Sequence, residues 1–332
     1  MTMKPLAMRD ALLERIWSEM GRNGDIFFAS ADFGSPVLDK IRADFPTRFV
    51  NVGIAEQNLI NISAGLSLEG YTVFAYAIAP FITMRCYEQI RVNLALLAEA
   101  RHLNVNLIGV GAGYSYVVSG PTHQCYEDIT LMRALPNMQV FSPADHVSTA
   151  ALFERCVAES GPKYLRLDAQ VLPVIYADGA PDVQRGFHVH RRGGRIILIA
   201  TGYMLHTAFV VAERLQAAGE EVGVIDLFDL ARFDVAALAA ALSGCRGIVT
   251  MEEGFGGRGG MDALLRGFVA RHLPAVRMLC IGVEPAYRFD LGTRLDLHEL
   301  VGIGPDASLR AVMAFLQELD TQNLFGLERE TL

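Results

Sequence analysis

The chain has 332 residues, of which 52% are hydrophobic and 20% charged, and its formal net charge is −8. This length suits two domains, and the composition excludes a disordered chain. The acidic balance argues against nucleic acid as a partner, because phosphate binding needs clustered Lys and Arg. No apolar run approaches the ~20 residues of a membrane helix, and the N-terminus has no signal-peptide core. Five widely spaced cysteines without a CxxC motif fit a reducing cytoplasm better than a disulfide framework or a zinc site.

Helices and strands alternate along the first half of the chain. An apolar stripe with four-residue spacing predicts a helix over residues 8–20, which Gly21 would end. Further on, the pattern predicts strands at 25–31, 71–77, 104–111, 138–142 and 163–167, and helices at 54–69, 83–99, 126–134 and 145–159. Short apolar runs between helices are typical of a parallel sheet that is covered on both faces.

Proline and glycine interrupt this alternation at residues 169–194, and we interpret 171–194 as a linker. We therefore predict two successive α/β sandwich domains over 1–170 and 195–332, each a mostly parallel sheet flanked by helices. The second domain is predicted from strands at 195–201, 221–227, 247–252 and 276–281, and from helices at 204–218, 234–243, 260–272 and 306–319.

Glu56 is the first candidate for chemistry, within the run NVGIAEQN at residues 51–58. It lies in the first turn of a predicted helix, where the helix dipole favours a carboxylate. A capping role explains this position as well as a functional one does. However, apolar neighbours such as Ile54 and Leu59 suit a carboxylate that exchanges a proton with a bound group.

Two further patterns lie in the first predicted domain. His123 follows a predicted strand within GPTHQ, where open α/β sheets place their ligand sites, and it is a candidate general acid or base. A histidine in a loop is nevertheless more often structural. Phe81, Met84 and Tyr87 share a three-residue spacing, which predicts one face of a helix and, taken alone, a core stripe.

A glycine-rich turn at residues 254–260 satisfies GxGxxG, the fingerprint of nicotinamide-binding domains. The fingerprint belongs in the first strand-to-helix turn of such a domain, whereas here it follows the third predicted strand. A nicotinamide oxidoreductase is therefore a remote alternative. The chain contains no P-loop, HExxH or GxSxG motif. It also has no GDG motif followed by a distant Asn, the pattern that holds magnesium and diphosphate in thiamine enzymes.

Several segments, in matching order, resemble the transketolase family. FVNVGIAEQNLIN at 49–61, the aromatic segment 71–89, GPTHQ at 120–124 and MRALPNMQVFSPAD at 132–145 resemble its pyrimidine-binding domain. Residues 195–260, with the TMEEG turn at 250–254, resemble its C-terminal domain. The resemblance runs from about residue 5 to 318. It implies a thiamine-diphosphate enzyme that transfers a two-carbon ketol unit from a ketose to an aldehyde.

The resemblance also implies which residues bind the cofactor. Glu56 matches the glutamate that hydrogen-bonds the pyrimidine ring and thereby promotes removal of the proton on the thiazolium C2 atom. Phe81 matches the aromatic residue that stacks on the pyrimidine. Ile54, Met84 and Tyr87 fall among the further cofactor contacts, with Met84 in place of an aromatic residue.

For the substrate, the resemblance places His123 near the C1 oxygen and puts Arg9 and Arg166 near positions that bind sugar phosphate. One residue departs from the family pattern. Transketolases usually read Asp-Gly-Pro-Thr-His, and here Ser119 replaces that aspartate, which contacts a substrate hydroxyl. Gly111 also stands near the place of a further histidine. Both changes argue against the ordinary pentose-phosphate acceptors.

A complete transketolase has an N-terminal half that supplies the diphosphate and Mg²⁺ site, and no such half is recognisable here. The resemblance therefore implies an N-terminal transketolase-like partner subunit in an α2β2 heterotetramer, with no metal ligand from this chain. A 2-oxo acid dehydrogenase β subunit, a 1-deoxyxylulose-5-phosphate synthase fragment and a non-catalytic scaffold stay open as alternatives. GPTHQ and the EQN run at 56–58 favour the transketolase.

Overall fold

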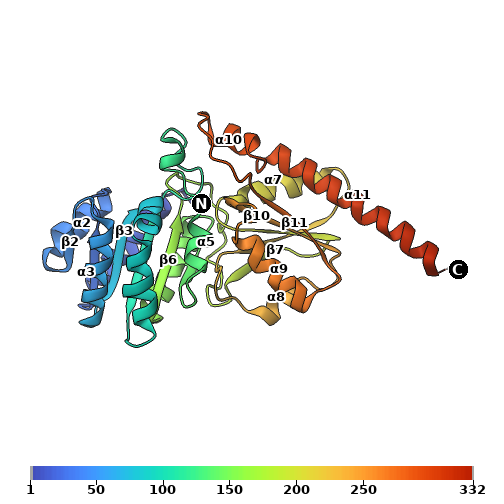
Figure 1. Ribbon diagram of the computed structural model, residues 1–332. Helices are drawn as coiled ribbons and strands as arrows, with labels where there is room; N and C mark the ends of the chain where they lie inside the picture. The colour runs from blue at the N-terminus through green and yellow to red at the C-terminus, as the bar shows by residue number, and fades with distance from the viewer. Residues whose placement is uncertain (1–2, 331–332) are drawn as a thin grey trace.

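The computed structural model describes residues 3–330, and these form two α/β units that lie side by side (Figure 1). The first unit holds a six-stranded sheet of order β2-β1-β3-β4-β6-β5, and all five strand pairs are parallel. Its strands are β1 (Ile26–Ser30), β2 (Phe49–Asn51), β3 (Thr72–Ile78), β4 (Asn104–Val110), β5 (Gln139–Phe141) and β6 (Gly161–Leu167).

Helices cover both faces of this first sheet, as the apolar strand runs predict. The helices are α1 (Met8–Met20), α2 (Pro36–Asp44), α3 (Glu56–Leu68), the short α4 (Tyr87–Gln89), α5 (Asp128–Arg133) and α6 (His146–Ala158). The apolar stripe of α1 is buried and packs with residues of β1, β3 and α6 on one face of the sheet. Residues of α3 and α5 form the core on the other face.

The second unit holds a five-stranded sheet of order β11-β10-β8-β9-β7, in which only β7 runs antiparallel. Its strands are β7 (Phe187–Arg191), β8 (Ile196–Ala200), β9 (Val222–Leu227), β10 (Gly247–Phe255) and β11 (Arg277–Val283). Because β7 pairs with β9, part of the predicted linker belongs to this sheet. The predicted fold class, two mostly parallel α/β units, is confirmed.

The helices of the second unit are α7 (Met204–Ala217), α8 (Val235–Ala241), α9 (Met261–His272), α10 (Arg294–Leu300) and α11 (Pro305–Glu330). α11 is longer than the predicted helix at 306–319, and its C-terminal end projects away from the second unit (Figure 1). Within the part of the chain that the structure describes, no helix combines the length and apolar character that crossing a membrane requires.

The segment at residues 81–96, which carries the candidate Phe81, differs from the predicted α-helix. The predicted α-helix at 83–99 is largely π-helical, over η2 (Phe81–Arg85) and η3 (Ile90–Leu96), with α4 between them. A π-helix bonds residue i to i+5, so residues three apart no longer share a face as they do in an α-helix. Short π-helical segments are frequent at functional sites.

Candidate functional site

Three of the predicted site residues follow parallel strands of the first sheet. Glu56 comes shortly after β2, Phe81 after β3, and His123 after β4. In the sheet, β1 lies between β2 and β3, so the strands that follow β1 in the sequence lie on opposite sides of it. The carboxyl ends of parallel strands meet at one edge, and the place where the strand order reverses is the usual ligand site of open α/β sheets.

Glu56 is the first residue of α3, and its side chain is only 3% exposed. Its carboxylate is paired: Arg85 Nη1 donates to Glu56 Oε2 at 2.7 Å. Arg85 is the last residue of η2, and its side chain is 45% exposed. Gln57 Nε2 also donates to the Arg85 carbonyl oxygen at 3.2 Å, which ties the start of α3 to the end of η2.

Phe81 lies beside this ion pair. The guanidinium carbon of Arg85 lies 4.5 Å from the centre of the Phe81 ring. The ring of His123 meets the same ring edge to face, with centroids 5.3 Å apart and planes at 69°. The Phe81 ring therefore contacts both His123 and Arg85, and Arg85 in turn binds Glu56. Sequence reasoning missed Arg85, although it is the only charged residue between Glu69 and Glu88.

The other predicted cofactor contacts lie further out. Ile54 is 76% exposed and Met84 is 38% exposed, so both present apolar surface at this edge of the sheet. The Tyr87 hydroxyl donates to the Leu131 carbonyl oxygen at 3.1 Å and so faces α5. Phe81, Met84 and Tyr87 thus do not form the single helical face that their spacing predicts, because the segment is π-helical.

The loop at residues 111–125, which we call the histidine loop, carries Ser119 and His123. It begins at Gly111, where φ is +105° and a Cβ atom would lie 2.1 Å from Tyr116 Cε2. The Tyr116 ring therefore occupies the space above Gly111 that a side chain would need. Its centroid lies 6.4 Å from that of His123. Ser119 is exposed, and the Nδ1 atom of His123 lies 3.0 Å from the Thr122 hydroxyl.

The two predicted phosphate-binding arginines differ in their surroundings. Arg9 Nε donates to Asp10 Oδ1 at 2.8 Å. Its side chain is 23% exposed. Arg166, in contrast, is 2% exposed and donates to Asp128 Oδ2 at 2.8 Å. Its burial and its ion pair favour a structural role, and Arg166 is therefore not part of the proposed substrate site.

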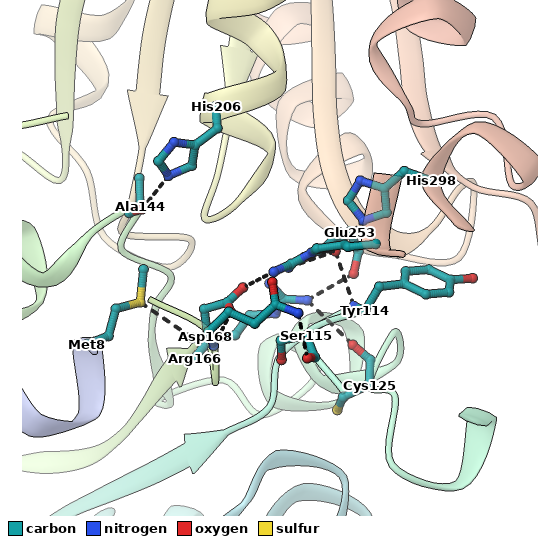
Figure 2. A network of polar contacts seen from close by, with 12 residues as sticks. Met8, Tyr114, Ser115, Cys125, Ala144, Arg166, Asp168, His206, Glu253 and His298 are labelled. Atoms are coloured by element: carbon teal, nitrogen blue, oxygen red, sulfur yellow. Dashed lines mark hydrogen bonds and ion pairs between the residues drawn. The ribbon is translucent and has the colours of Figure 1, made fainter. Parts of the chain in front are cut away.

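Glu253, in β10, is the centre of a buried polar network between the two units (Figure 2). Arg294 Nη2 donates to Glu253 Oε2 at 2.7 Å, and His298 Nε2 lies 2.6 Å from Oε1. Arg294 also pairs with Asp168, which follows β6, at 2.5 Å. Burial alone would raise the pKa of Glu253, but Arg294 and His298 hold it well below its ordinary value. The network therefore joins charged residues from both units.

This network also anchors the histidine loop. The backbone N–H of Tyr114 donates to Glu253 Oε1 at 3.1 Å. The preceding Gly113 has φ +54°, and a Cβ atom there would lie 2.2 Å from Glu253 Oε2. Only glycine permits so close an approach, so residue 113 is fixed by the contact between the units. The second unit thus helps to position the loop that carries His123.

The glycine-rich turn has a structural explanation. Glu252 accepts hydrogen bonds from the backbone N–H groups of Met261 at 2.9 Å and Asp262 at 2.8 Å, at the start of α9. Burial raises the pKa of Glu252 to about 7, against the lowering effect of these bonds. A dinucleotide would need this helix N-terminus for its phosphates. Because Glu252 already caps it, the turn does not support a nicotinamide site.

Within residues 3–330, no three or more His, Cys, Asp and Glu side chains are grouped so that they could hold a metal ion. The acidic residues described above are instead bound by arginine side chains or backbone N–H groups.

Comparison with known proteins gives two family matches. Residues 4–174 match the transketolase pyrimidine-binding domain, and residues 186–307 match the transketolase C-terminal domain. A subunit of the apulose-4-phosphate transketolase of Actinobacillus succinogenes is 30% identical over 301 residues, which cover 90% of this chain and 95% of that protein. The 6-deoxy-6-sulfo-D-fructose transketolase subunit SqwH of a Clostridium species is 28% identical over 249 residues, covering 74% and 76%.

Solved structures of transketolases share the fold of this chain. A split-gene transketolase, described as an inactive β4 tetramer, has a TM-score of 0.82 and 30% identity, with 93% of this chain and 98% of that chain covered. The transketolase of Campylobacter jejuni superposes with a TM-score of 0.76 at 19% identity, which shows the fold alone. That superposition includes 94% of this chain but only 47% of the Campylobacter chain.

Proposed function

Because this chain belongs to the transketolase family, we propose that it is the C-terminal subunit of a split, thiamine-diphosphate-dependent transketolase. It would transfer a two-carbon ketol unit from a ketose to an aldehyde. The observation that carries the proposal is the meeting of Glu56, Phe81 and His123 at the carboxyl edge of the first sheet.

The residues present fit the pyrimidine ring of the cofactor. A planar, nitrogen-bearing group already lies between Glu56 and Phe81, namely the guanidinium of Arg85, at 2.7 Å from the carboxylate and 4.5 Å from the ring centre. A pyrimidine is also planar and carries ring nitrogen. Glu56 would hold its nitrogen and Phe81 would stack on its face, while exposed Ile54 and Met84 would supply apolar contacts at the rim.

When bound, thiamine diphosphate supplies the electron sink for breaking the carbon–carbon bond of the ketose. This chain would contribute the proton chemistry. Glu56, nearly excluded from water, would hold or release a proton at the pyrimidine nitrogen. His123 is half-buried beside Phe81 and would donate a hydrogen bond to a substrate oxygen. Arg9, whose side chain is 23% exposed, would attract a substrate phosphate.

The diphosphate and its Mg²⁺ need ligands that we assign to a partner. The described residues offer no cluster of metal-ligating side chains, and the chain contains no GDG motif. We therefore propose that an N-terminal transketolase-like subunit supplies this part of the site, within an α2β2 heterotetramer. The names of several relatives, which call them transketolase subunits, support such a division.

The direct test of the function is a transfer assay. This chain mixed with an N-terminal transketolase-like chain, thiamine diphosphate and Mg²⁺ should move a two-carbon unit from a ketose to an aldehyde, and neither chain alone should do so. Release of carbon dioxide from pyruvate without a lipoyl acceptor, and with no transfer from a ketose, would favour the synthase alternative instead.

Ser119 leads to a prediction about the acceptor. A neutral hydroxyl cannot replace the charge-assisted hydrogen bond of an aspartate, which is worth ~1.5–3 kcal/mol, or roughly ten- to a hundredfold in preference. We expect the acceptor to depend little on an α-hydroxyl group, and Ser119→Asp to raise the preference for α-hydroxyaldehydes by about tenfold or more. Two relatives are named for apulose 4-phosphate and 6-deoxy-6-sulfo-D-fructose, so the sugars vary within the family.

The measurement is a competition between an α-hydroxyaldehyde and its deoxy analogue in the reconstituted complex. Ser119→Ala is the matched control and should change the ratio little. A strong preference for the hydroxylated acceptor that persists in Ser119→Ala would show that this position does not set specificity.

A further inference from the structure

Arg85 makes two contacts that need explanation, because both use groups that the proposed function assigns to the cofactor. Its Nη1 atom donates to Glu56 Oε2 at 2.7 Å, and its guanidinium carbon lies 4.5 Å from the centre of the Phe81 ring. The carboxylate is buried, with 3% of its side chain exposed. A buried carboxylate without a partner is costly, so Arg85 stabilises the site in the absence of a ligand.

The geometry of η2 explains why Arg85 can do this. The π-helical turn starts at Phe81 and ends at Arg85, which lets the guanidinium return over the ring at the start of the same turn. Gln57 holds the Arg85 carbonyl oxygen, so the backbone is tied to α3 while the side chain remains 45% exposed. An exposed arginine side chain can leave toward solvent without repacking the core.

We propose that Arg85 is a built-in stand-in for the pyrimidine ring, which closes the cofactor site of the free subunit and must be displaced when thiamine diphosphate binds. This inference rests on the proposed roles of Glu56 and Phe81. Arg85 and the pyrimidine compete for the same carboxylate and the same ring. Arg85 therefore lowers the affinity for the cofactor while keeping the buried carboxylate paired before assembly.

The test is the affinity of the reconstituted complex for thiamine diphosphate at fixed Mg²⁺, measured by calorimetry. Arg85→Ala should bind the cofactor about tenfold more tightly, because a half-exposed ion pair and an exposed cation–π contact need not be broken. Arg85→Lys keeps the charge without the planar fork, and should fall between Arg85→Ala and the unaltered complex. It also serves as a second variant if Arg85→Ala folds poorly.

Arg91→Ala is the matched control, because Arg91 is an exposed arginine of the adjoining η3 and its removal changes the net charge equally. Its affinity should stay within about twofold of the unaltered complex, since an exposed charge outside the site changes binding little. In a Glu56→Gln background, Arg85→Ala should lose most of its gain, because the ion pair of Arg85 is already reduced to a weaker hydrogen bond with a neutral amide.

The outcomes separate this inference from the proposed function. Unchanged or weaker binding in Arg85→Ala would overturn the stand-in role, even if the complex binds the cofactor and transfers ketol units normally. An equal gain in the Glu56→Gln background would also overturn it, since the competition would then not involve Glu56. Failure of the unaltered complex to bind thiamine diphosphate would reject the proposed function and this inference together.

Discussion

Replacing Glu56 with glutamine is expected to lower turnover of the reconstituted enzyme by about 10²–10⁴-fold, the usual range for a lost proton-transfer group. An amide cannot take or give the proton that the carboxylate would share with the pyrimidine nitrogen. The two side chains are nearly the same size, and Arg85 could still donate to the amide oxygen. The fold should therefore persist, so that the loss reports on chemistry.

The direct readout is hydrogen–deuterium exchange at the C2 atom of the bound cofactor, followed by NMR after an acid quench. Exchange should slow in Glu56→Gln in proportion to turnover. Glu69→Gln is the control, because Glu69 is exposed at the C-terminal end of the same helix α3. Exchange at the unaltered rate in Glu56→Gln would remove Glu56 from the mechanism.

The second large effect is expected from the network between the two units. Arg294→Met would leave Asp168 buried without its cation and Glu253 with His298 as its remaining side-chain partner. Removing one partner of a buried ion pair typically costs ~3–5 kcal/mol. We expect a loss of this size in the free energy of unfolding. Turnover should fall as well, because Glu253 also binds the Tyr114 N–H and so positions the histidine loop.

Urea unfolding followed by circular dichroism measures the first part of this prediction. Arg214→Met is the matched control, since it breaks the exposed pair between Arg214 and Asp306. Exposed pairs contribute only ~0–1 kcal/mol. If the two variants were equally stable, the network would contribute no more than a surface ion pair.

The sequence predicts the fold well where the apolar pattern is strong. The buried stripe of α1 and the apolar runs of β3, β4, β8 and β10 are in the predicted places. The misses have physical reasons. β7 has the sequence FHVHR and lies at the edge of its sheet. It therefore lacks the continuous apolar run that is typical of a central strand. α2 was missed although Ser35 and Pro36 form a recognisable helix start.

The site is only partly predictable, because its contacts join residues far apart in the chain. The resemblance selects Glu56, Phe81 and His123, and the structure brings them together. It could not select Arg85, whose partner lies 29 residues away and whose position depends on a π-helical turn that no apolar period predicts. Nor could a short local match reveal that Arg166 is buried.

The central claim is that this chain holds one part of a cofactor site and a partner subunit holds the rest. A calorimetric titration of thiamine diphosphate with Mg²⁺ into three samples tests it most directly: this chain, an N-terminal transketolase-like partner chain, and their equimolar mixture. We expect tight binding in the mixture, with one cofactor per pair of chains, and weak binding to this chain alone. Binding to the isolated chain as tight as that to the mixture would contradict the claim, since the described residues would then suffice without a partner.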